Sequence, residues 1–360
     1  MSHGKIYFDG TIEDWCGATI QLKDGSSNKN QLGDFYANGF YVDEKLLENI
    51  KISGVNVPSY RFANIPFLKT IELENVGNVG AYAFSGCQNL TSVSGSTSLL
   101  GYGAFDGCSS LQTIDFGDSV SQINCSFDDA NLTTIVMYNS NLTDLHFNKT
   151  GNNFVRVAVN IASFEYFDKT SSFEILELYP TSANTEAQLP ASVGEIGTLV
   201  LHEGITKFST KAESGVTQKA ISKIYVPQSL RSFDCDANIF DENSKIVFAN
   251  EESVINISFT KACNTANMKA KKFYLKDGVE TELTSHTFVT TYETPETLTE
   301  ISPYAFVDYK NLQKVVIKSN VKKIGEGAFL GLTKLVELTI EEGVETIEAS
   351  AFEGCMGLEN

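Results

Sequence analysis

The sequence repeats itself near its C-terminus at a fixed interval. Three equivalent pairs stand 23 residues apart, namely Ile324 and Ile347, Phe329 and Phe352, and Leu335 and Leu358. A repeat of this length cannot bury an apolar face alone, so successive copies must stack around a shared core. The period therefore predicts a solenoid with one rung per repeat.

The clearest copy, residues 312–334, reads LQKVVIKSNVKKIGEGAFLGLTK. Val315 and Ile317 alternate with polar or outward positions, as in a short half-buried strand. Val321 and Ile324 then begin a second extended piece. A turn glycine follows, and Phe329 leads the chain back toward the core. The copy predicts two short strands and a glycine turn in each rung.

The same register extends upstream with steps of 19 to 25 residues. The leading apolar positions are Leu47, Leu68, Leu90, Leu111, Leu132, Phe154, Phe173, Ile196 and Ile221, with Asn243 as the next. Each lead is followed by an inward strand residue, and we expect these to form one buried column of parallel strands. Its members are Ile71, Val93, Ile114, Ile135, Val157, Leu176, Leu199 and Ile224.

Two longer segments interrupt the simple count. Lys5–Gly39 resembles Lys245–Gly278, because both begin Lys-Ile-x-Phe and reach Phe-Tyr before a turn glycine. We interpret each as a rung with an inserted hairpin. The predicted organisation is a hairpin rung over 1–43 (with 1–4 a candidate tag remnant), a repeat array over 44–243, a second hairpin rung over 244–279, and C-terminal repeats over 280–360. Without a Pro/Ser-rich linker, one continuous solenoid is expected.

Charge and hydropathy argue against two classes of partner. The chain has 27 Lys and Arg against 45 Asp and Glu, a formal net charge of −18. Such a charge repels nucleic acid and anionic lipid surfaces. No apolar run approaches the roughly 20 residues of a membrane helix, and no signal peptide is visible at the N-terminus. We expect neither nucleic-acid binding nor direct membrane insertion.

Three short stretches resemble a known family. They are GAYAFSGC, GYGAFDGC and GVETIEASAFEGC, and they are similar to the BspA-like class of leucine-rich repeats. The stretch Gly10–Cys16 resembles the hairpin that often punctuates such arrays. The resemblance implies a β-rich leucine-rich-repeat solenoid on a bacterial or protist cell surface, with adhesion as the role of several members.

The cysteines and glycines of the motif have structural interpretations. Cys87, Cys108 and Cys355 each stand three residues after the motif phenylalanine, where another repeat has Leu332. A position that accepts Cys or Leu requires an apolar group, so we expect buried, unbonded thiols. The glycines of residues 101–107 do not have phosphate-loop spacing and are expected to serve turns.

Other candidate sites also have simple explanations. Cys16 follows Asp14 and Trp15, but packing of the tryptophan explains this trio without a nucleophile. The pairs Asp128–Asp129, Asp234–Asp236 and Asp241–Glu242 match no calcium loop and are interpreted as solvated turns. The four histidines are scattered. We therefore expect no catalytic residue, no cofactor and no metal site.

One surface feature departs from the regular pattern. Outward positions are Glu72, Ser94 and Asp115 in early rungs but become apolar or aromatic in the middle. The resulting candidate partner-binding residues are Val136, Tyr138, Tyr179, Val200, His202 and Tyr225. An exposed stripe of this composition is typical of an interaction site. The alternative is that a loop such as 179–190 folds over it.

The favoured function is a non-enzymatic binding or adhesion protein that presents its repeat surface to a protein or glycan at the cell surface. The resemblance, and not composition, supplies that location. One alternative is an intracellular, cytoplasmic scaffold for protein interactions, which reduced cysteines would suit. A second is the ligand-recognition part of a larger secreted enzyme.

Overall fold

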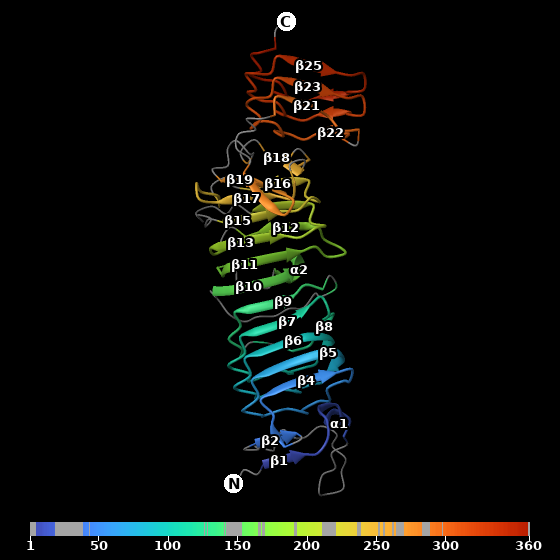
Figure 1. The fold of residues 1–360 in the computed structure, drawn as a ribbon, viewed down its shortest axis with the longest axis vertical. Coiled ribbons are helices and arrows are strands. Elements are labelled where there is room, and N and C mark those ends of the chain that lie inside the picture. Colours follow the sequence, from blue (N-terminus) through green and yellow to red (C-terminus); the bar gives the residue numbers. More distant parts are fainter. Residues whose placement is uncertain are drawn as a thin grey trace. The chain divides into compact units, whose positions relative to one another are not determined.

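The computed structural model describes residues 5–18, 39–42, 44–125, 127, 129–139, 141, 153–164, 167, 170–190, 193–210, 221–235, 239–250, 253–254, 256–260, 263, 270–282, 289–296 and 298–358. The chain forms two compact units, Met1–Asn184 and Thr185–Asn360. Each unit is a β-solenoid of short, stacked, mainly parallel strands with little helix (Figure 1). The predicted fold class is confirmed.

The described part of the first unit contains eleven strands and two short helices. Their bounds are β1 Lys5–Phe8, α1 Ile12–Gly17, β2 Gly39–Val42, β3 Lys45–Leu46, β4 Asn49–Ser53, β5 Thr70–Val79, β6 Ser92–Leu100, β7 Thr113–Gly117, β8 Gln122–Ile123, β9 Thr134–Met137, β10 Asn153–Asn160, α2 Ile161–Phe164 and β11 Ser172–Tyr179. The main sheet has the order β4-β5-β6-β7-β9-β10-β11, and β8 pairs with β6. Figure 1 shows these strands stacked one above another.

In the first unit, each strand pairs with residues that lie one sequence repeat away. Asn49 pairs with Thr70, Thr70 with Ser92, and Asn153 with Ser172. Each strand thus lies beside the strand one repeat away, which is the parallel arrangement that the repeat predicted. The interval between repeats in the sequence is therefore the interval between paired residues on neighbouring strands.

The core lies where the repeat placed it. The predicted column is at most 1% exposed at all eight positions, from Ile71 to Ile224. The leads from Leu47 to Ile221 are also buried. Asn243 is exposed, so its prediction as a lead is wrong; the Asp241 carboxylate organises a turn there, accepting from the Asn243 and Ser244 N–H groups. Ile246 and Phe248 are buried as predicted.

The motif phenylalanines form stacked ladders through each core. Phe62, Phe84 and Phe105 stack in the first unit, with successive ring centroids 5.4 and 5.7 Å apart. In the second unit Phe329 lies between Phe306 and Phe352, at 4.7 and 5.1 Å. Identical side chains one rung apart meet face to face because the rungs are in register.

The turn beside each phenylalanine uses a left-handed residue. Tyr82 and Tyr304 have φ of 55° and 57° there, and the next rungs have Gly103 and Gly327. A Cβ on Gly327 would lie 2.5 Å from the Tyr304 ring, and one on Gly103 would lie 2.4 Å from the Tyr82 ring. These glycines therefore provide both the backbone angle and the space for a neighbouring ring. The turn interpretation of these glycines is confirmed.

Among its described residues, the second unit contains fifteen strands. Their bounds are β12 Glu186–Leu189, β13 Ile196–Leu201, β14 Lys207–Thr210, β15 Ile221–Val226, β16 Ser232–Asp234, β17 Lys245–Phe248, β18 Ser258–Phe259, β19 Lys271–Lys276, β20 Val279–Glu282, β21 Thr291–Glu293, β22 Glu300–Ile301, β23 Lys314–Ile317, β24 Lys323–Ile324, β25 Glu337–Ile340 and β26 Thr346–Ile347. Within it, the strand orders are β13-β15-β17-β19-β20, β12-β14-β16-β18, β21-β23-β25 and β22-β24-β26.

The two interrupting segments differ from one another. β19 and β20 form an antiparallel hairpin whose turn residues Asp277 and Gly278 both have positive φ, as the favoured two-residue turn requires. The hairpin interpretation of Gly10–Cys16 is wrong, because this stretch contains α1. Thr11 caps that helix, and the Thr11 and Asp14 side chains form a capping box.

The thiols follow the predicted pattern. Cys87, Cys108 and Cys355 are buried and unbonded, and each donates its S–H to the carbonyl of the motif phenylalanine one rung back. The distances are 3.2 Å to Phe62, 3.3 Å to Phe84 and 3.1 Å to Phe329. The sequence did not predict the disulfide between Cys235 and Cys263 in the second unit.

Candidate binding surface

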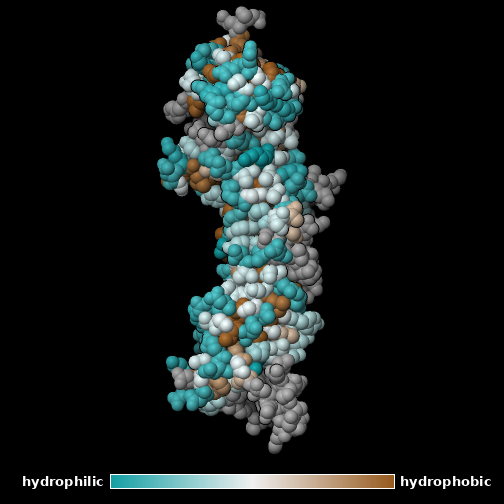
Figure 2. Space-filling model, turned by 90° about the vertical axis from the view of Figure 1, so that its right-hand side faces the viewer, coloured by the Kyte–Doolittle hydropathy of each residue, from teal (hydrophilic) through white to brown (hydrophobic). Residues whose placement is uncertain are grey.

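Hydrophobic area alone does not single out a site on the surface. Figure 2 shows one face of the molecule, on which hydrophobic residues form small groups among hydrophilic ones. The exposed large hydrophobic residues are also dispersed along the chain, from Tyr7 and Tyr102 to Val336 and Met356. Such residues, standing singly, are normal for a soluble surface. A candidate site must therefore be identified from the arrangement of particular side chains.

The middle rungs are less exposed than the outward pattern predicted. Val136 is only 4% exposed, and the equivalent Ala158 and Val247 are also buried. The prediction that Val136 contributes to a surface stripe is therefore wrong. Because β9 and β10 are buried on both faces here, apolar residues at these outward positions are ordinary core residues. The candidate surface reduces to the half-buried residues beyond them.

Tyr138 and Tyr179 are brought together in the first unit. Tyr138 directly follows β9, and Tyr179 is the last residue of β11. Their ring centroids are 4.0 Å apart, with 9° between the ring planes. Both side chains are half-buried, so the stacked pair retains an accessible surface.

Asn160 explains how two residues from strands on either side of β10 can meet. Asn160 pairs with Tyr179 in register but is fully buried. Its amide donates to the Asn139 carbonyl at 2.6 Å and accepts from the Ser163 N–H at 2.7 Å, at the start of α2. Because this short side chain is directed inward, the two rings close over its position.

A charged pair borders the tyrosines. Arg156 Nε donates to Glu177 Oε1 at 2.7 Å, and the Tyr179 hydroxyl donates to Glu177 Oε2 at 3.4 Å. Partial burial, and then the Glu177 carboxylate, raise the pKa of Tyr179, so the hydroxyl is neutral at physiological pH. The hydrogen bond to Glu177 likewise raises the pKa of Arg156. The group presents a neutral aromatic donor beside a compensated ion pair.

Two aliphatic residues extend this surface. Val155 on β10 and Ile175 on β11 are 46% and 38% exposed, and Ile175 pairs with Arg156 in register. We call Tyr138, Arg156, Ile175, Glu177 and Tyr179 together the tyrosine surface. Arg156 and Ile175 were not predicted as site residues, because the pattern followed only the outward position between the two inward residues and the one two residues further along. A scan of the residue before the first inward position identifies both.

The candidate residues of the second unit have a different setting. Tyr225 on β15 donates its hydroxyl to Glu280 Oε1 on β20 at 2.6 Å. Lys223 also bonds to Glu280, and its ammonium lies 4.6 Å from the Tyr225 ring centre. The β19–β20 hairpin thus engages Tyr225, so hairpin residues partly cover it. Val200 and His202 are half-buried at the end of β13.

The remaining sequence candidates have structural roles. Trp15 lies 5.0 Å from both Phe8 and Phe40, and the Arg61 guanidinium lies 5.4 Å from its ring. Burial raises the pKa of the adjacent Cys16 thiol to about 12, which is the opposite of nucleophile activation. The packing interpretation therefore accounts for the trio.

Acidic side chains in the turns accept backbone hydrogen bonds. Asp129 Oδ2 accepts from the Gly107 N–H at 3.1 Å, and Asp241 binds two N–H groups. Asp128 and Asp236 lie outside the described residues. Within the described ranges, no three His, Cys, Asp or Glu side chains are grouped to hold a metal ion. The same residues contain no helix that is long and apolar enough to span a membrane.

Among the solved structures that resemble this chain are three leucine-rich-repeat proteins of low sequence identity. A leucine-rich cell surface protein of Faecalibacterium prausnitzii is 16% identical, with 82% of this chain and 88% of that chain covered and a TM-score of 0.22. A leucine-rich repeat protein of Eubacterium ventriosum is 17% identical, with 86% and 91% covered and a TM-score of 0.23. One from Bacteroides ovatus is 16% identical, with 79% and 81% covered and a TM-score of 0.23.

The family is established by a direct sequence match. Comparison with curated proteins gives no match. The family model of the BspA type leucine-rich repeat region matches residues 37–152 and 248–360 in six copies, which is more than half of the chain. The matched ranges contain the Phe62–Phe105 and Phe306–Phe352 ladders, the left-handed turns and the buried motif cysteines. The chain belongs to the BspA-type leucine-rich-repeat family.

Proposed function

We propose that this repeat protein is a non-enzymatic binding or adhesion protein, and that it presents the tyrosine surface to a protein or glycan partner outside the cell. The observation that supports this proposal is the stacked pair of Tyr138 and Tyr179. Tyrosine provides a large, rigid contact area at a small cost in conformational entropy. Half-exposed aromatic residues of this kind contribute much of the binding energy in interfaces.

The surroundings of the pair suit recognition. Glu177 engages both Arg156 and Tyr179, so the rings and the charges are held in place before a partner arrives. Preorganisation reduces the entropy lost on binding. Ile175 adds exposed apolar area beside the guanidinium. The surface therefore combines an aromatic face, an aliphatic contact and directional polar groups.

Two further observations support an extracellular setting. The Cys235–Cys263 disulfide suits an oxidising compartment, because cytosolic reductants keep most thiols reduced. The family resemblance also implies a cell-surface location. The buried thiols fit this setting, since a cysteine enclosed in the core is protected from oxidation.

The test is a double variant, Tyr138→Ser with Tyr179→Ser, compared with the native protein on immobilised matrix proteins and a glycan array. Tyr7→Ser with Tyr41→Ser is the matched control, because that pair is also stacked, at 4.7 Å, in the same unit. We expect binding to fall at least tenfold in the first variant and to remain unchanged in the control, with equal melting temperatures. Equal binding by both variants would refute the assignment.

A further inference from the structure

In the described part of the second unit, two sheets follow one another along the chain at the interval of an additional rung. Taken in chain order, their equivalent outward residues form a row of Glu186, Lys207, Ser232 and Ser258 in the first sheet and Glu300, Lys323 and Thr346 in the second. Neighbours in this row are 21 to 26 residues apart, except for Ser258 and Glu300, which are 42 apart. That interval equals two repeats, yet among the described strands none lies between β18 and β22 in this row.

The chain midway along this interval has another role. β20 stands where the count places the absent rung, but it pairs antiparallel with β19. Its Glu280 binds Lys223 and Tyr225 on β15. Both β18 and β22 are therefore edge strands of their sheets in the described part of the chain.

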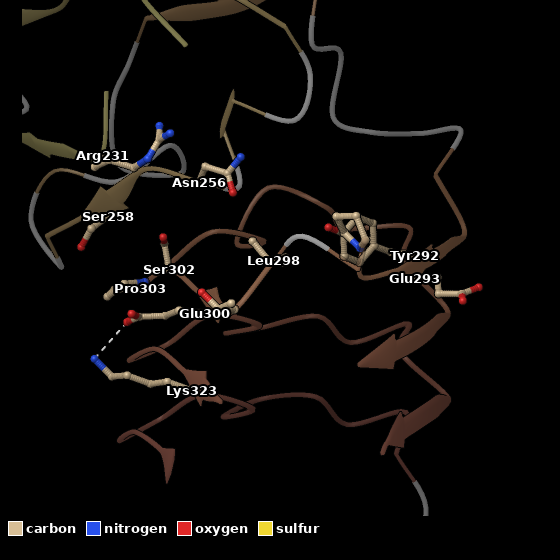
Figure 3. Close-up of a pocket in the computed structure, with 12 residues that line it drawn as sticks. Arg231, Asn256, Ser258, Tyr292, Glu293, Leu298, Glu300, Ser302, Pro303 and Lys323 are labelled. Carbon is tan, nitrogen blue, oxygen red and sulfur yellow. Dashed lines mark ion pairs between the residues drawn. The ribbon is translucent and has the colours of Figure 1, made fainter. Parts of the chain in front are cut away.

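A cleft of about 650 Å³ lies at this position. Figure 3 shows Arg231, Asn256 and Ser258 on one side and Leu298, Glu300 and Ser302 on the other. Away from the cleft, Lys272 on β19 forms an ion pair with Asp308 at 3.6 Å. This ion pair connects β19, which precedes the missing rung in the sequence, to the turn after β22, which follows it.

The backbone on each side is arranged to receive a strand. In a parallel ladder, alternate residues direct their N–H and C=O groups to opposite neighbours. Ser258 donates its N–H to the Arg231 carbonyl at 2.8 Å, so the next residue, Phe259, directs its groups away from β16. Ile301 accepts from the Gly325 N–H at 2.8 Å, so Glu300 directs its groups away from β24. Glu300 lines the cleft, and Phe259 adjoins the lining residue Ser258.

The dimensions and charges fit a single polypeptide strand. With strands about 4.8 Å apart and a layer about 10 Å deep, the volume corresponds to roughly four residues at about 3.3 Å each. Arg231 and Lys323 balance Glu293 and Glu300 among the lining residues, and Lys323 Nζ lies 3.0 Å from the Glu300 carboxylate. Because positive and negative side chains balance in the lining, the cleft favours a ligand that binds through main-chain hydrogen bonds rather than through its net charge.

We propose that this cleft accepts an extended segment of a partner polypeptide, which adds as the missing rung between β18 and β22. Strand addition of this kind derives affinity from main-chain hydrogen bonds and specificity from alternate side chains. We expect the partner segment to have the sequence pattern of a rung. Its polar residue would stand in the row of Ser258 and Glu300, and a small apolar residue would lie between Phe259 and Ile301. This site is separate from the tyrosine surface and does not rest on it.

The probe is a fluorescent synthetic peptide with the sequence of Val321–Phe329, which already forms such a rung in this chain. Its binding to the full chain is measured by fluorescence anisotropy. Glu300→Pro removes the N–H that faces the cleft, and proline is tolerated on an edge strand. Glu300→Ala is the matched control, because it removes the carboxylate and keeps the N–H. We expect saturable binding, at least tenfold weaker for Glu300→Pro and within threefold of native for Glu300→Ala.

Two further measurements make the outcome decisive. The bound peptide should slow hydrogen exchange at the Phe259 and Glu300 amides, and a peptide N-methylated at alternate residues should not bind. Melting temperatures confirm that both variants are folded. Absence of saturable binding, or equal binding by Glu300→Pro and native protein, would overturn the proposal. An oligosaccharide that binds native protein and Glu300→Pro equally, but not Asn256→Ala, would assign the cleft to glycans instead.

Discussion

Tyr138 and Tyr179 stack at 4.0 Å although β10 lies between the strands that hold them. The rings of residues two rungs apart can meet only where the residue between them leaves the surface, and Asn160 does so. The buried polar side chain of Asn160 therefore determines how two half-buried aromatic rings are arranged at the surface. Such a relationship is invisible in a pattern that classifies each position only as inward or outward.

Replacing Asn160 by alanine should destabilise the first unit by about 1–2 kcal/mol. The change removes the acceptor for the Ser163 N–H at the start of α2 and the donor to the Asn139 carbonyl. Urea unfolding measures the loss. Asn89→Ala is the control, since its side chain makes a comparable inter-rung bond to the Pro66 carbonyl at an exposed position. Equal stability of the two variants would contradict the role given to Asn160.

Phe329→Ala should cost about 3–5 kcal/mol of unfolding free energy. The ring is fully buried between Phe306 and Phe352, so its removal leaves a cavity that the stacked rungs cannot close without losing register. Thermal and denaturant unfolding give the value. Leu330→Ala, at the neighbouring half-buried position, should cost much less. A near-neutral Phe329→Ala would show that the ladder is not the core of these rungs.

The fold was predictable because one physical requirement repeats through the chain. Each rung must place the same apolar groups at the same height, so a column such as Ile71 to Leu176 is visible as a period in the sequence. Cys87 and Cys108 were predictable for the same reason, since Leu332 shows what their position requires. Sequence was sufficient for the inward positions from Ile71 to Ile224, although the same register wrongly placed Asn243 as a buried lead.

The details of the surface were less predictable, because they depend on contacts that the repeat pattern does not encode. Val136 is buried on both faces of its strand, and Tyr225 is engaged by Glu280, 55 residues away. Helix α1 replaced an expected hairpin because Thr11 and Asp14 cap it locally. The Cys235–Cys263 disulfide joins two positions that the period does not relate. The partner-binding role of Tyr138, Tyr179, Val200 and His202 stays a prediction.

Removing the Cys235–Cys263 disulfide should lower stability by about 3–4 kcal/mol. The two residues are 28 apart in the sequence, and closing a loop of this length restricts the unfolded chain by about that amount. The double variant Cys235→Ser with Cys263→Ser is compared with native protein, each with and without reductant. Reductant should destabilise only the native protein, and an equal response of both proteins would mean that the bond does not form in solution.

Substitutions at Gly327 and Gly331 can distinguish two requirements for glycine at a turn, namely a positive φ and space for a neighbouring ring. Both have positive φ, of 58° and 70°, but only at Gly327 would a Cβ meet a ring, that of Tyr304 at 2.5 Å. Gly331→Ala should cost about 1 kcal/mol from its backbone angle alone. Gly327→Ala should cost clearly more, because Tyr304 must also move. Denaturant unfolding of the two variants tests this order, and a smaller loss for Gly327→Ala would reject the packing argument.

Alkaline pH should destabilise the first unit through its buried thiols. Burial raises the pKa of Cys87 and of Cys125 to about 12, against about 9 in the unfolded chain. Between these values the unfolded state loses protons that the folded state keeps, so the free energy of unfolding falls as pH rises. Each thiol contributes at most about 1.4 kcal/mol per pH unit, and stability is unaffected by this group below pH 9.

Tyrosines and lysines also titrate in this range, so the prediction is made for a difference between variants. Cys87→Leu introduces the residue that Leu332 provides at the equivalent position, so it should retain stability at pH 7. It should also lose less stability between pH 9 and 11 than native protein does. Urea midpoints across that range give the comparison. The same burial should make Cys87 react slowly with a thiol reagent at pH 8 until the protein is unfolded. Parallel pH profiles for the two proteins, or fast labelling of native Cys87, would show that the thiol is not enclosed between its rungs.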